Sequence, residues 1–136
     1  MIRHFFIYGA LGWTLEIFWT GLGSLFLGNW QLPGFTYLWM FPIYGLAVLM
    51  EPIHDRIISL PWYVRGLFWT VLIFAVEYTA GLLLFALLGN CPWDYSASTP
   101  FHINGYIRLD FAPAWFVVGL LFEKTHQVLD RLMVRS

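Results

Sequence analysis

Two glutamates stand alone in long apolar stretches of this 136-residue sequence. Glu16 lies 13 residues after Arg3, and Glu77 lies 12 residues after Arg65. In a helix that rises 1.5 Å per residue, both carboxyl groups would lie ~18–20 Å along their helices, near the middle of a bilayer. A charged side chain at that depth costs at least ~2.5–3.5 kcal/mol. We therefore expect both glutamates to face the protein interior, either neutral or paired.

Two carboxylates at one depth can do three kinds of chemistry. They can share a proton, because like charges a few ångströms apart strongly raise one pKa. They can jointly hold a cation or a cationic solute. They can also accept hydrogen bonds from polar groups of a connecting loop, for which His102 and Arg108 are the candidate donors. The sequence leaves these three alternatives open.

The segment 90–110 carries the second set of chemically versatile residues. Trp93 and Tyr95 suit an interface with lipid headgroups, and Asn104-Gly105 is a strong turn signal. A long connection without periodicity is usually functional or disordered, and the aromatic content of this one argues against disorder. We therefore predict an ordered outer loop that caps a helix bundle. Four of its polar side chains are candidate ligand-binding groups: Asp94, His102, Asn104 and Arg108.

The composition indicates the solvent in which these groups must be placed. Hydrophobic residues make up 60% of the chain and charged residues only 11%, against roughly a quarter charged in soluble domains. A chain this short cannot bury so much apolar surface from water, so its partner is the lipid bilayer. The net charge of −1 gives no basic surface for nucleic acid. The single cysteine, Cys91, excludes an internal disulfide.

The hydrophobic pattern predicts an all-α membrane protein with four transmembrane helices in a single domain, residues 1–136. Each span needs ~20 mostly apolar residues. The first and third would stop at Gly28-Asn29 and Gly89-Asn90, and the second contains Pro42. We read the N-terminal apolar stretch as the first span rather than a removed signal peptide, because no small-residue cleavage pattern closes it. The predicted spans are about 5–27, 35–53, 64–88 and 111–129.

The basic residues predict the orientation. The connection 28–36 has no Lys or Arg, and the connection 90–110 has only Arg108. The positive-inside rule therefore places both termini in the cytoplasm and the loop 90–110 on the outer side of the cell membrane. The basic residues assigned to the inner side are Arg3, Arg56, Arg65, Lys124, Arg131 and Arg135.

The chain also repeats itself when residue n is aligned with residue n+61. Glu16 then falls on Glu77, and LFLGN at 25–29 falls on ALLGN at 86–90. A proline follows near the start of the next span in each half, Pro42 and Pro113. This pattern predicts two parallel-repeat helical hairpins related by an axis along the membrane normal. The alternative is coincidence, because Leu-Gly-Asn is a common match in a leucine-rich chain.

Five short blocks give the chain a resemblance to a known family. They read GWTLE, PIYG, EYTAG, WDYS and FHINGYI, and they follow the family's order over most of the chain. The chain resembles the small membrane proteins classed as putative ABC-transporter type IV, or CmpB-like, which have animal transmembrane relatives. The resemblance implies a multi-pass membrane protein with matching positions at Trp13, Glu16, Pro42, Tyr44, Gly45, Glu77, Trp93, Asp94, Tyr95, Asn104 and Gly105.

The last block departs from the family's usual F-N-x-N-G-R-I pattern. His102 replaces the first Asn, Tyr106 replaces the Arg, and Arg108 is a candidate for the basic role. The chain has no phosphate-binding loop of the G-x-x-x-x-G-K-[ST] type. The resemblance therefore supplies a membrane architecture but no mechanism.

Other polar groups carry weaker signals. Glu51, His54 and Asp55 in EPIHD have metal-friendly chemistry, but a solvated helix end explains them and we predict no metal site. Glu123 with Gln127, and His126 with Asp130, are spaced as i,i+4 pairs on exposed helix faces. No Ser-His-Asp or Cys-His arrangement is convincing, so the sequence identifies no catalytic residue.

Three functions remain open. In a transporter or channel, Glu16 and Glu77 line a polar path for a proton, a cation or a small cationic solute, and a homodimer widens the narrow wall of four helices. In an intramembrane enzyme, one glutamate is the general base, and Asp94, His102 and Arg108 bind the headgroup of a lipid or lipid-linked substrate. In an accessory subunit of a membrane complex, the polar groups only hold the outer loop. The sequence names no cofactor, substrate or complex partner.

Overall fold

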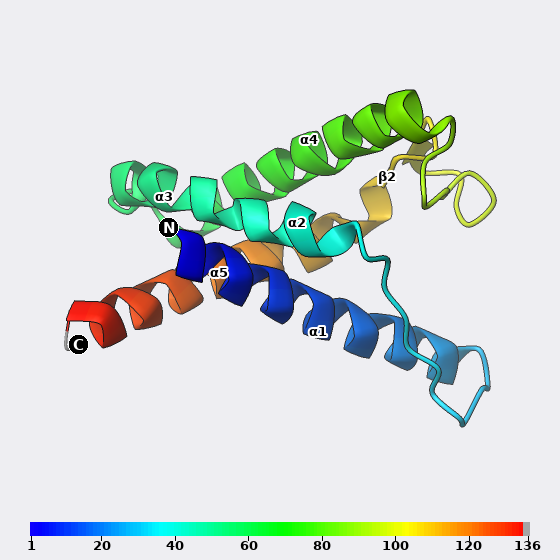
Figure 1. Cartoon of the computed structure of the whole chain (residues 1–136), viewed down its shortest axis with the longest axis horizontal. Coiled ribbons are helices and arrows are strands. Elements are labelled where there is room, and N and C mark those ends of the chain that lie inside the picture. Colours follow the sequence, from blue (N-terminus) through cyan, green and yellow to red (C-terminus); the bar gives the residue numbers. More distant parts are fainter. Residues whose placement is uncertain (135–136) are drawn as a thin grey trace. The chain divides into compact units, whose positions relative to one another are not determined.

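The computed structural model describes residues 1–134, so Arg135 of the predicted inner basic set lies outside the described part. The chain divides into two compact units, Met1–Glu51 and Pro52–Ser136. Helices make up most of both units (Figure 1).

The first unit is a helical hairpin. Helix α1 (Ile2–Phe26) is followed by a connection and then by α2 (Met40–Gly45) and the 3₁₀ helix η1 (Leu46–Met50), which pack against α1. The close approach depends on glycine, because a Cβ atom on Gly12 would overlap the Tyr44 side chain. Small residues of this kind let helix backbones approach in membrane proteins. Helix α1 ends just before Gly28, whose φ of 81° is a left-handed conformation that suits glycine.

The second unit is a larger hairpin. It contains α3 (Glu51–Ile57, whose first residue closes the first unit), α4 (Trp62–Leu88), the 3₁₀ helix η2 (Leu109–Phe111) and α5 (Ala112–Val134). Helices α4 and α5 pack against each other, and Trp69 of α4 is fully buried and fills the space left by Gly119 of α5. Helix α4 ends at Gly89, with a φ of 78°. The predicted Gly-Asn stops are therefore present in both units.

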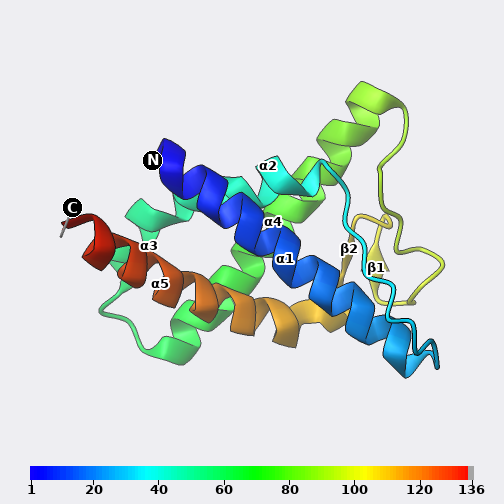
Figure 2. The ribbon, with the colours of Figure 1, turned by 60° about the horizontal axis from the view of Figure 1, so that its bottom comes forward.

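The connection between α4 and α5 is folded around a short antiparallel pair of strands, β1 (His102–Ile103) and β2 (Ile107–Arg108) (Figure 2). Asn104 and Gly105 both have positive φ, 51° and 73°, as a type I′ turn requires. The indole N–H of buried Trp93 donates to the carbonyl of Tyr106 over 3.0 Å. The Asn-Gly turn predicted from the sequence is therefore present, and Trp93 attaches the start of the loop to its hairpin.

The first, third and fourth predicted spans agree with α1, α4 and α5, and most of their ends agree to within a few residues. The predicted start of the second span was wrong. Residues 35–39 are not helical, and the helical stretch from Met40 to Ile57 is divided into α2, η1 and α3. Starting at Met40 places Pro42 in the first helical turn, where its missing N–H is not needed. A helix from residue 35 would have placed the same proline in its interior.

One helix of the described part, α4, is both long and apolar enough to cross a membrane, with a mean hydropathy of 2.3 over its best window. Only 17% of that window is buried, whereas the core helix of a soluble protein is mostly buried. Helix α1 has comparable length but is less apolar than α4, and α5 contains four charged residues, Glu123, Lys124, Asp130 and Arg131. Membrane crossing by α1, α5 and the divided second stretch stays a prediction.

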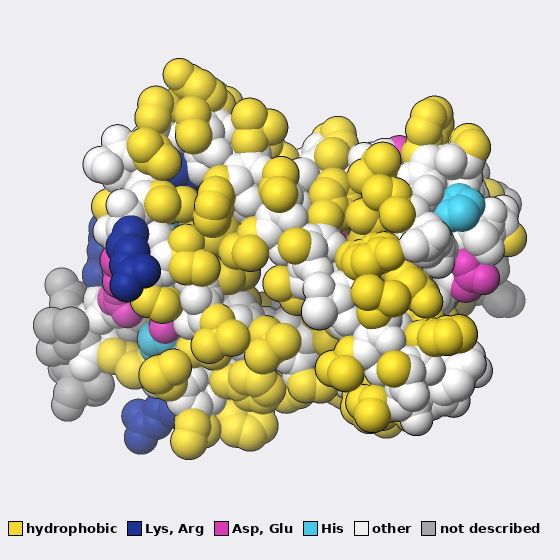
Figure 3. All heavy atoms as spheres, turned by 90° about the horizontal axis from the view of Figure 1, so that it is seen from above, with side chains coloured by type: hydrophobic (Ala, Val, Ile, Leu, Met, Phe, Trp, Pro, Cys, Tyr) yellow, Lys and Arg dark blue, Asp and Glu magenta, His cyan; other side chains and the backbone are white. Residues whose placement is uncertain are grey.

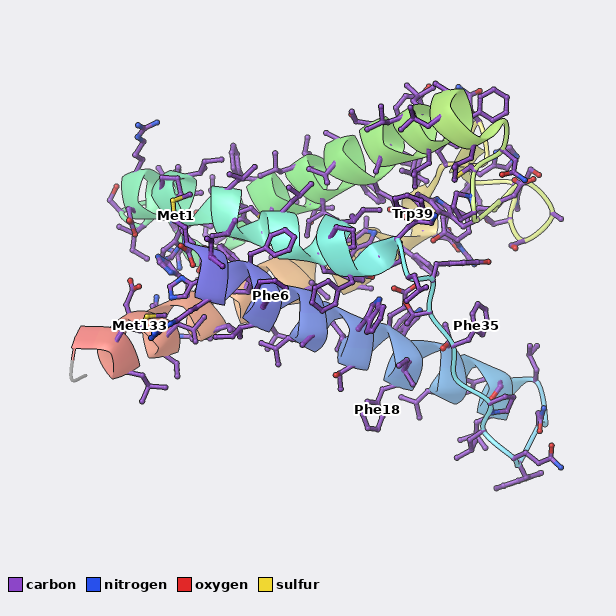
Figure 4. All side chains as sticks on the ribbon, viewed as in Figure 1. Met1, Phe6, Phe18, Phe35, Trp39 and Met133 are labelled. Carbon is purple, nitrogen blue, oxygen red and sulfur yellow. The ribbon has the colours of Figure 1, made fainter. Side chains whose placement is uncertain are left out.

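Large apolar side chains lie exposed on every long helix. Phe18 of α1 is 66% exposed, Val71 of α4 is 69% exposed and Leu132 of α5 is 61% exposed. Hydrophobic side chains cover most of the surface seen in Figure 3, and Phe18 projects outward from α1 in Figure 4. Apolar surface of this extent is expected of a protein that contacts lipid or other protein.

Candidate functional site

Glu16 lies in the middle of α1 and receives hydrogen bonds from hydroxyl groups. Thr36 donates to Glu16 Oε2 over 3.0 Å, and the phenol of Tyr44 in α2 also hydrogen-bonds this carboxyl group. The connection that carries Thr36 is fixed along α1, because the indole N–H of Trp13 donates to the carbonyl of Tyr37 over 3.0 Å. Tertiary packing within the first unit therefore brings two hydroxyls to one half-buried carboxyl group.

Glu77 lies in the middle of α4 and has a similar environment. Its side chain is buried, and the hydroxyl of Tyr95 donates to Glu77 Oε1 over 3.1 Å. Tyr95 belongs to the loop 90–110 that follows α4, as Thr36 belongs to the connection that follows α1. In each unit, therefore, a mid-helix glutamate is hydrogen-bonded by the connection that follows its own helix.

The two donors expected from the sequence, His102 and Arg108, bond elsewhere. Arg108 binds both carboxylate oxygens of Asp110, at 3.1 and 2.6 Å, and its guanidinium stacks 4.1 Å above the centre of the Phe111 ring. His102 Nδ1 accepts the backbone N–H of Gly105 over 3.0 Å. The expectation that these two side chains donate to the glutamates was therefore wrong. Both side chains instead bond partners two or three residues away along the chain.

The remaining polar groups of the loop shape its backbone. Asp94 Oδ1 accepts the backbone N–H of Ser96 over 2.9 Å, and this hydrogen bond lowers the pKa of the Asp94 carboxyl group. The hydrogen bond from Arg108 likewise lowers the pKa of Asp110. Asn104 Nδ2 donates to the Tyr78 hydroxyl over 2.8 Å, which attaches the turn to α4.

A second pair of carboxylates, missed as functional residues in the sequence, is more tightly held. In the first unit, Glu51 Oε1 lies 2.5 Å from His4 Nδ1 and accepts the Tyr8 hydroxyl over 2.7 Å. In the second unit, Glu123 accepts Arg65 Nε at 2.8 Å and the Trp69 indole N–H at 2.7 Å on Oε1. A second Arg65 nitrogen reaches Glu123 Oε2 at 3.0 Å, which completes the bidentate geometry typical of strong arginine–carboxylate pairs.

These groups correct two expectations from the sequence. His54 was expected at a solvated helix end, yet it is 3% exposed, and its Nδ1 lies 3.5 Å from Glu123 Oε1. Glu123 and His126 were expected on exposed helix faces, yet they are 3% and 4% exposed. Spacing of i,i+4 fits a buried face as well as an exposed one, so periodicity alone could not decide. Within residues 1–134, no three acidic, His or Cys side chains are placed to hold one metal ion.

The two units correspond at more positions than the sequence suggested. With the same offset of 61, His4 falls on Arg65 and Tyr8 falls on Trp69, and both pairs bind a glutamate of the following helical stretch. Glu51 lies 9 residues after Pro42, and Glu123 lies 10 after Pro113. The 3₁₀ helix η1 explains why the first spacing is one residue shorter. A 3₁₀ helix rises about 2.0 Å per residue, so the chain covers the distance from proline to glutamate in fewer residues. An alignment extended to these positions could have identified Glu51 and Glu123.

The contact between the two helices also corresponds in the two units, but the aromatic residue and the glycine have exchanged helices. In the first unit, the ring of Phe5 on the first helix packs against Gly45 on the second. In the second unit, Gly66 on the first helix receives the ring of Phe116 on the second. Phe5 and Gly66 are 61 residues apart, so one aromatic ring fills the equivalent contact in both hairpins. This exchange supports the predicted repeat.

A family model described as Putative ABC-transporter type IV matches residues 3–135, which is nearly the whole chain. No solved structure matches the chain.

Proposed function

Because the chain belongs to the putative ABC-transporter type IV family, we propose that it is a small membrane transporter in which Glu16 and Glu77 bind and release a proton or another small cation. The observation that carries the proposal is the placement of both carboxyl groups in mid-helix with hydroxyl partners from Thr36, Tyr44 and Tyr95. Helix α4, which holds Glu77, is long and apolar enough to cross a membrane.

Hydroxyl partners suit a carboxyl group that changes its protonation state. A hydroxyl can donate to a carboxylate and can also accept a hydrogen bond from a carboxylic acid. An arginine can only donate and keeps its charge, so it would hold the carboxyl group as an anion. Glu123, bound by Arg65 at two oxygens, illustrates that fixed case in the same chain. Glu16 and Glu77 are therefore better suited to proton exchange than Glu123.

The outer loop does not favour the enzymatic alternative. That alternative needs His102 and Arg108 to bind a lipid headgroup, but His102 accepts a backbone amide and Arg108 is paired with Asp110. The loop instead supplies Tyr95 to Glu77. We assign the loop the role of holding and covering the carboxyl group of the second unit, and we propose a homodimer as the transporting assembly, to be checked by native mass spectrometry.

Reconstituted flux tests the proposal directly. Purified protein in liposomes that contain a pH-sensitive dye would be given a potassium diffusion potential, and proton uptake would be followed, with sodium uptake measured in parallel. Glu16→Gln and Glu77→Gln keep the side-chain shape but cannot exchange a proton at the same position. We expect each to reduce the flux at least ~10-fold, about 1.4 kcal/mol or more in the barrier.

The control is Asp130→Asn, which removes an exposed carboxyl group near the end of α5 and should leave the flux unchanged. Size-exclusion chromatography and circular dichroism would verify that each variant folds. Full flux in both glutamine variants would reject the proposal. Loss of folding in both would instead assign the carboxyl groups to a structural role.

A further inference from the structure

Glu16 lies in an aromatic part of the contact between α1 and α2. The Tyr44 side chain packs against Gly12 and hydrogen-bonds the Glu16 carboxyl group. Trp13 lies three residues before Glu16, a spacing that places two side chains next to each other on a helix. The rings of Trp13 and Phe41 meet edge to face, with 5.1 Å between their centres. Glu16 and these three aromatic residues are all half-buried, so each keeps some exposed surface.

A carboxylate among aromatic rings suits an organic cation. The faces of aromatic rings attract a cation that lies within about 6 Å of their centres, and quaternary ammonium compounds are recognised in this way. A hard metal ion such as Ca²⁺ or Mg²⁺ instead takes about six oxygen ligands or more. Glu16 and its two hydroxyl partners, Thr36 and Tyr44, offer fewer than that. The rings and the single negative charge therefore favour a cation with an apolar surface.

The first unit provides no lysine or arginine for this carboxyl group. Arg3 is the only Lys or Arg among residues 1–51, and it precedes Glu16 by 13 residues, which is about 20 Å along a helix. Residues 17–50 carry no charged side chain, and His4 is paired with Glu51. A cation that binds Glu16 therefore has to come from outside this hairpin.

The second unit has a similar set of groups, but it supplies its own cation. The Tyr95 hydroxyl donates to Glu77. The guanidinium carbon of Arg108 lies 5.9 Å from the centre of the Tyr95 ring and 4.1 Å from the centre of the Phe111 ring. Both distances are within the range of a cation–π contact. An organic cation thus already stacks on the aromatic residue that binds the mid-helix glutamate of this unit.

We propose that Glu16, with the rings of Trp13, Phe41 and Tyr44, forms a binding site for a small organic cation of the quaternary ammonium class. Arg108 is its internal counterpart in the second unit. The role of this cation as the transported solute rests on the transport function proposed above. The binding of the cation to the first unit does not.

Binding of choline to the wild-type protein tests the site without a transport assay. Choline carries a quaternary ammonium group, and in its neutral analogue a carbon atom replaces the nitrogen. Saturation-transfer NMR in a maltoside detergent would measure both dissociation constants. We expect the neutral analogue to bind at least ~10-fold more weakly, because it lacks the charge that the rings and the carboxylate attract. Equal binding of the two compounds, absence of choline binding, or displacement of choline by equimolar sodium would overturn the proposal.

Two variants locate the site in the first unit. Glu16→Gln removes the negative charge and should weaken choline binding at least ~10-fold, to the level of the neutral analogue. Phe41→Leu removes one aromatic face and should weaken binding about 2- to 30-fold, as the range of cation–π energies implies. The matched control is Phe18→Leu, because Phe18 is 66% exposed on α1, and its affinity should equal that of the wild type. Wild-type affinity in folded Glu16→Gln would place the site elsewhere and overturn the proposal.

Uptake of radiolabelled choline by the liposomes then separates this inference from the transport function. We expect wild-type uptake that is lost in Glu16→Gln. Proton flux that depends on Glu16, without choline binding, would reject the organic cation and leave the proposed transport function. Choline binding without flux of any cation would reject the transport function and leave the binding site. Binding without choline uptake in a protein that carries protons would remove choline-like cations as the transported solute.

Discussion

Trp69 donates its indole N–H to Oε1 of Glu123 over 2.7 Å, and both side chains are buried between α4 and α5. Arg65, one helical turn before Trp69, binds both oxygens of the same carboxylate. These three residues, which we call the polar clamp, hold α4 and α5 together at one end of the second hairpin. Trp69 also packs against Gly119, so the polar clamp and the apolar contact of the two helices share one side chain.

The clamp predicts a large effect of removing its carboxylate. Glu123→Ala leaves the Arg65 guanidinium without its two acceptors and Trp69 without its own. Breaking a buried ion pair by removing one partner typically costs about 3–5 kcal/mol, so we expect a clear fall in the thermal unfolding midpoint in detergent. The neighbouring Lys124 is exposed, and Lys124→Ala should unfold like the wild type. Equal midpoints for the two variants would show that the clamp does not stabilise the hairpin.

The glycines of α1 predict opposite effects of the same substitution. A Cβ atom on Gly12 would overlap the Tyr44 side chain, whereas Gly23 has open space around it. Gly12→Ala should lower the free energy of unfolding by about 1–3 kcal/mol, as overpacking does. Gly23→Ala should raise it by up to ~1 kcal/mol, because alanine is the better helix former. The comparison needs only thermal unfolding, and a stabilising Gly12→Ala would contradict the close packing of α1 on α2.

The hydroxyl partners of the mid-helix glutamates predict graded effects on transport. Thr36→Val and Tyr95→Phe each remove one hydrogen bond to a carboxyl group, worth about 0.5–1.5 kcal/mol. We therefore expect a flux about 2- to 10-fold lower, which is less than the loss in the glutamine variants. Thr79→Val is the matched control, since the Thr79 hydroxyl donates to the Ala75 carbonyl of its own helix. A loss of flux as large in Thr79→Val would show that these effects are not specific to the glutamates.

The predicted orientation can be tested with single cysteines. Burial raises the pKa of the Cys91 thiol, so its reaction with a maleimide should need a higher pH than that of an exposed thiol. In a Cys91→Ala background, Ser98→Cys in the outer loop should react with a membrane-impermeant maleimide in intact cells. Ser59→Cys between α3 and α4 should react only after the membrane is opened. Both serines are exposed, so labelling of both from one side would refute the orientation.

The loop 90–110 should lose stability in acid. The pKa values of Asp94 and Asp110 are lowered by the hydrogen bonds that their carboxylates accept from Ser96 and Arg108, respectively. A carboxyl group whose pKa is lowered by folding contributes stability above its unfolded value of about 3.9 and loses that contribution as the pH falls through the folded value. Hydrogen exchange of the loop amides, relative to those of α4, should therefore become faster below about pH 4. Asp94→Asn should show faster exchange already at pH 7, and an unchanged rate would contradict the role of Asp94 in the loop.

Several features of the fold followed from local sequence. Helix ends at Gly28 and Gly89 were predictable because glycine adopts the left-handed conformation that ends a helix without strain. The Asn104-Gly105 turn was predictable for the same reason. The start of the second helical stretch was not, because residues 35–39, of which four are apolar or aromatic, look like the start of a span in sequence but form a non-helical connection along α1. Their backbone hydrogen bonds go partly to Thr20, a contact that no local pattern reveals.

The sequence by itself determined which carboxyl groups lie deep in apolar helices, because the cost of placing Glu16 and Glu77 in such a stretch depends only on their neighbours along the chain. Tertiary structure decided what each carboxyl group binds. The partners of Glu51 and Glu123 lie 47 and 58 residues away, and they meet only when the two helices of each hairpin pack together. Periodicity places a residue on a face of its own helix, but the packing of that face against another helix makes Glu123 and His126 buried rather than exposed.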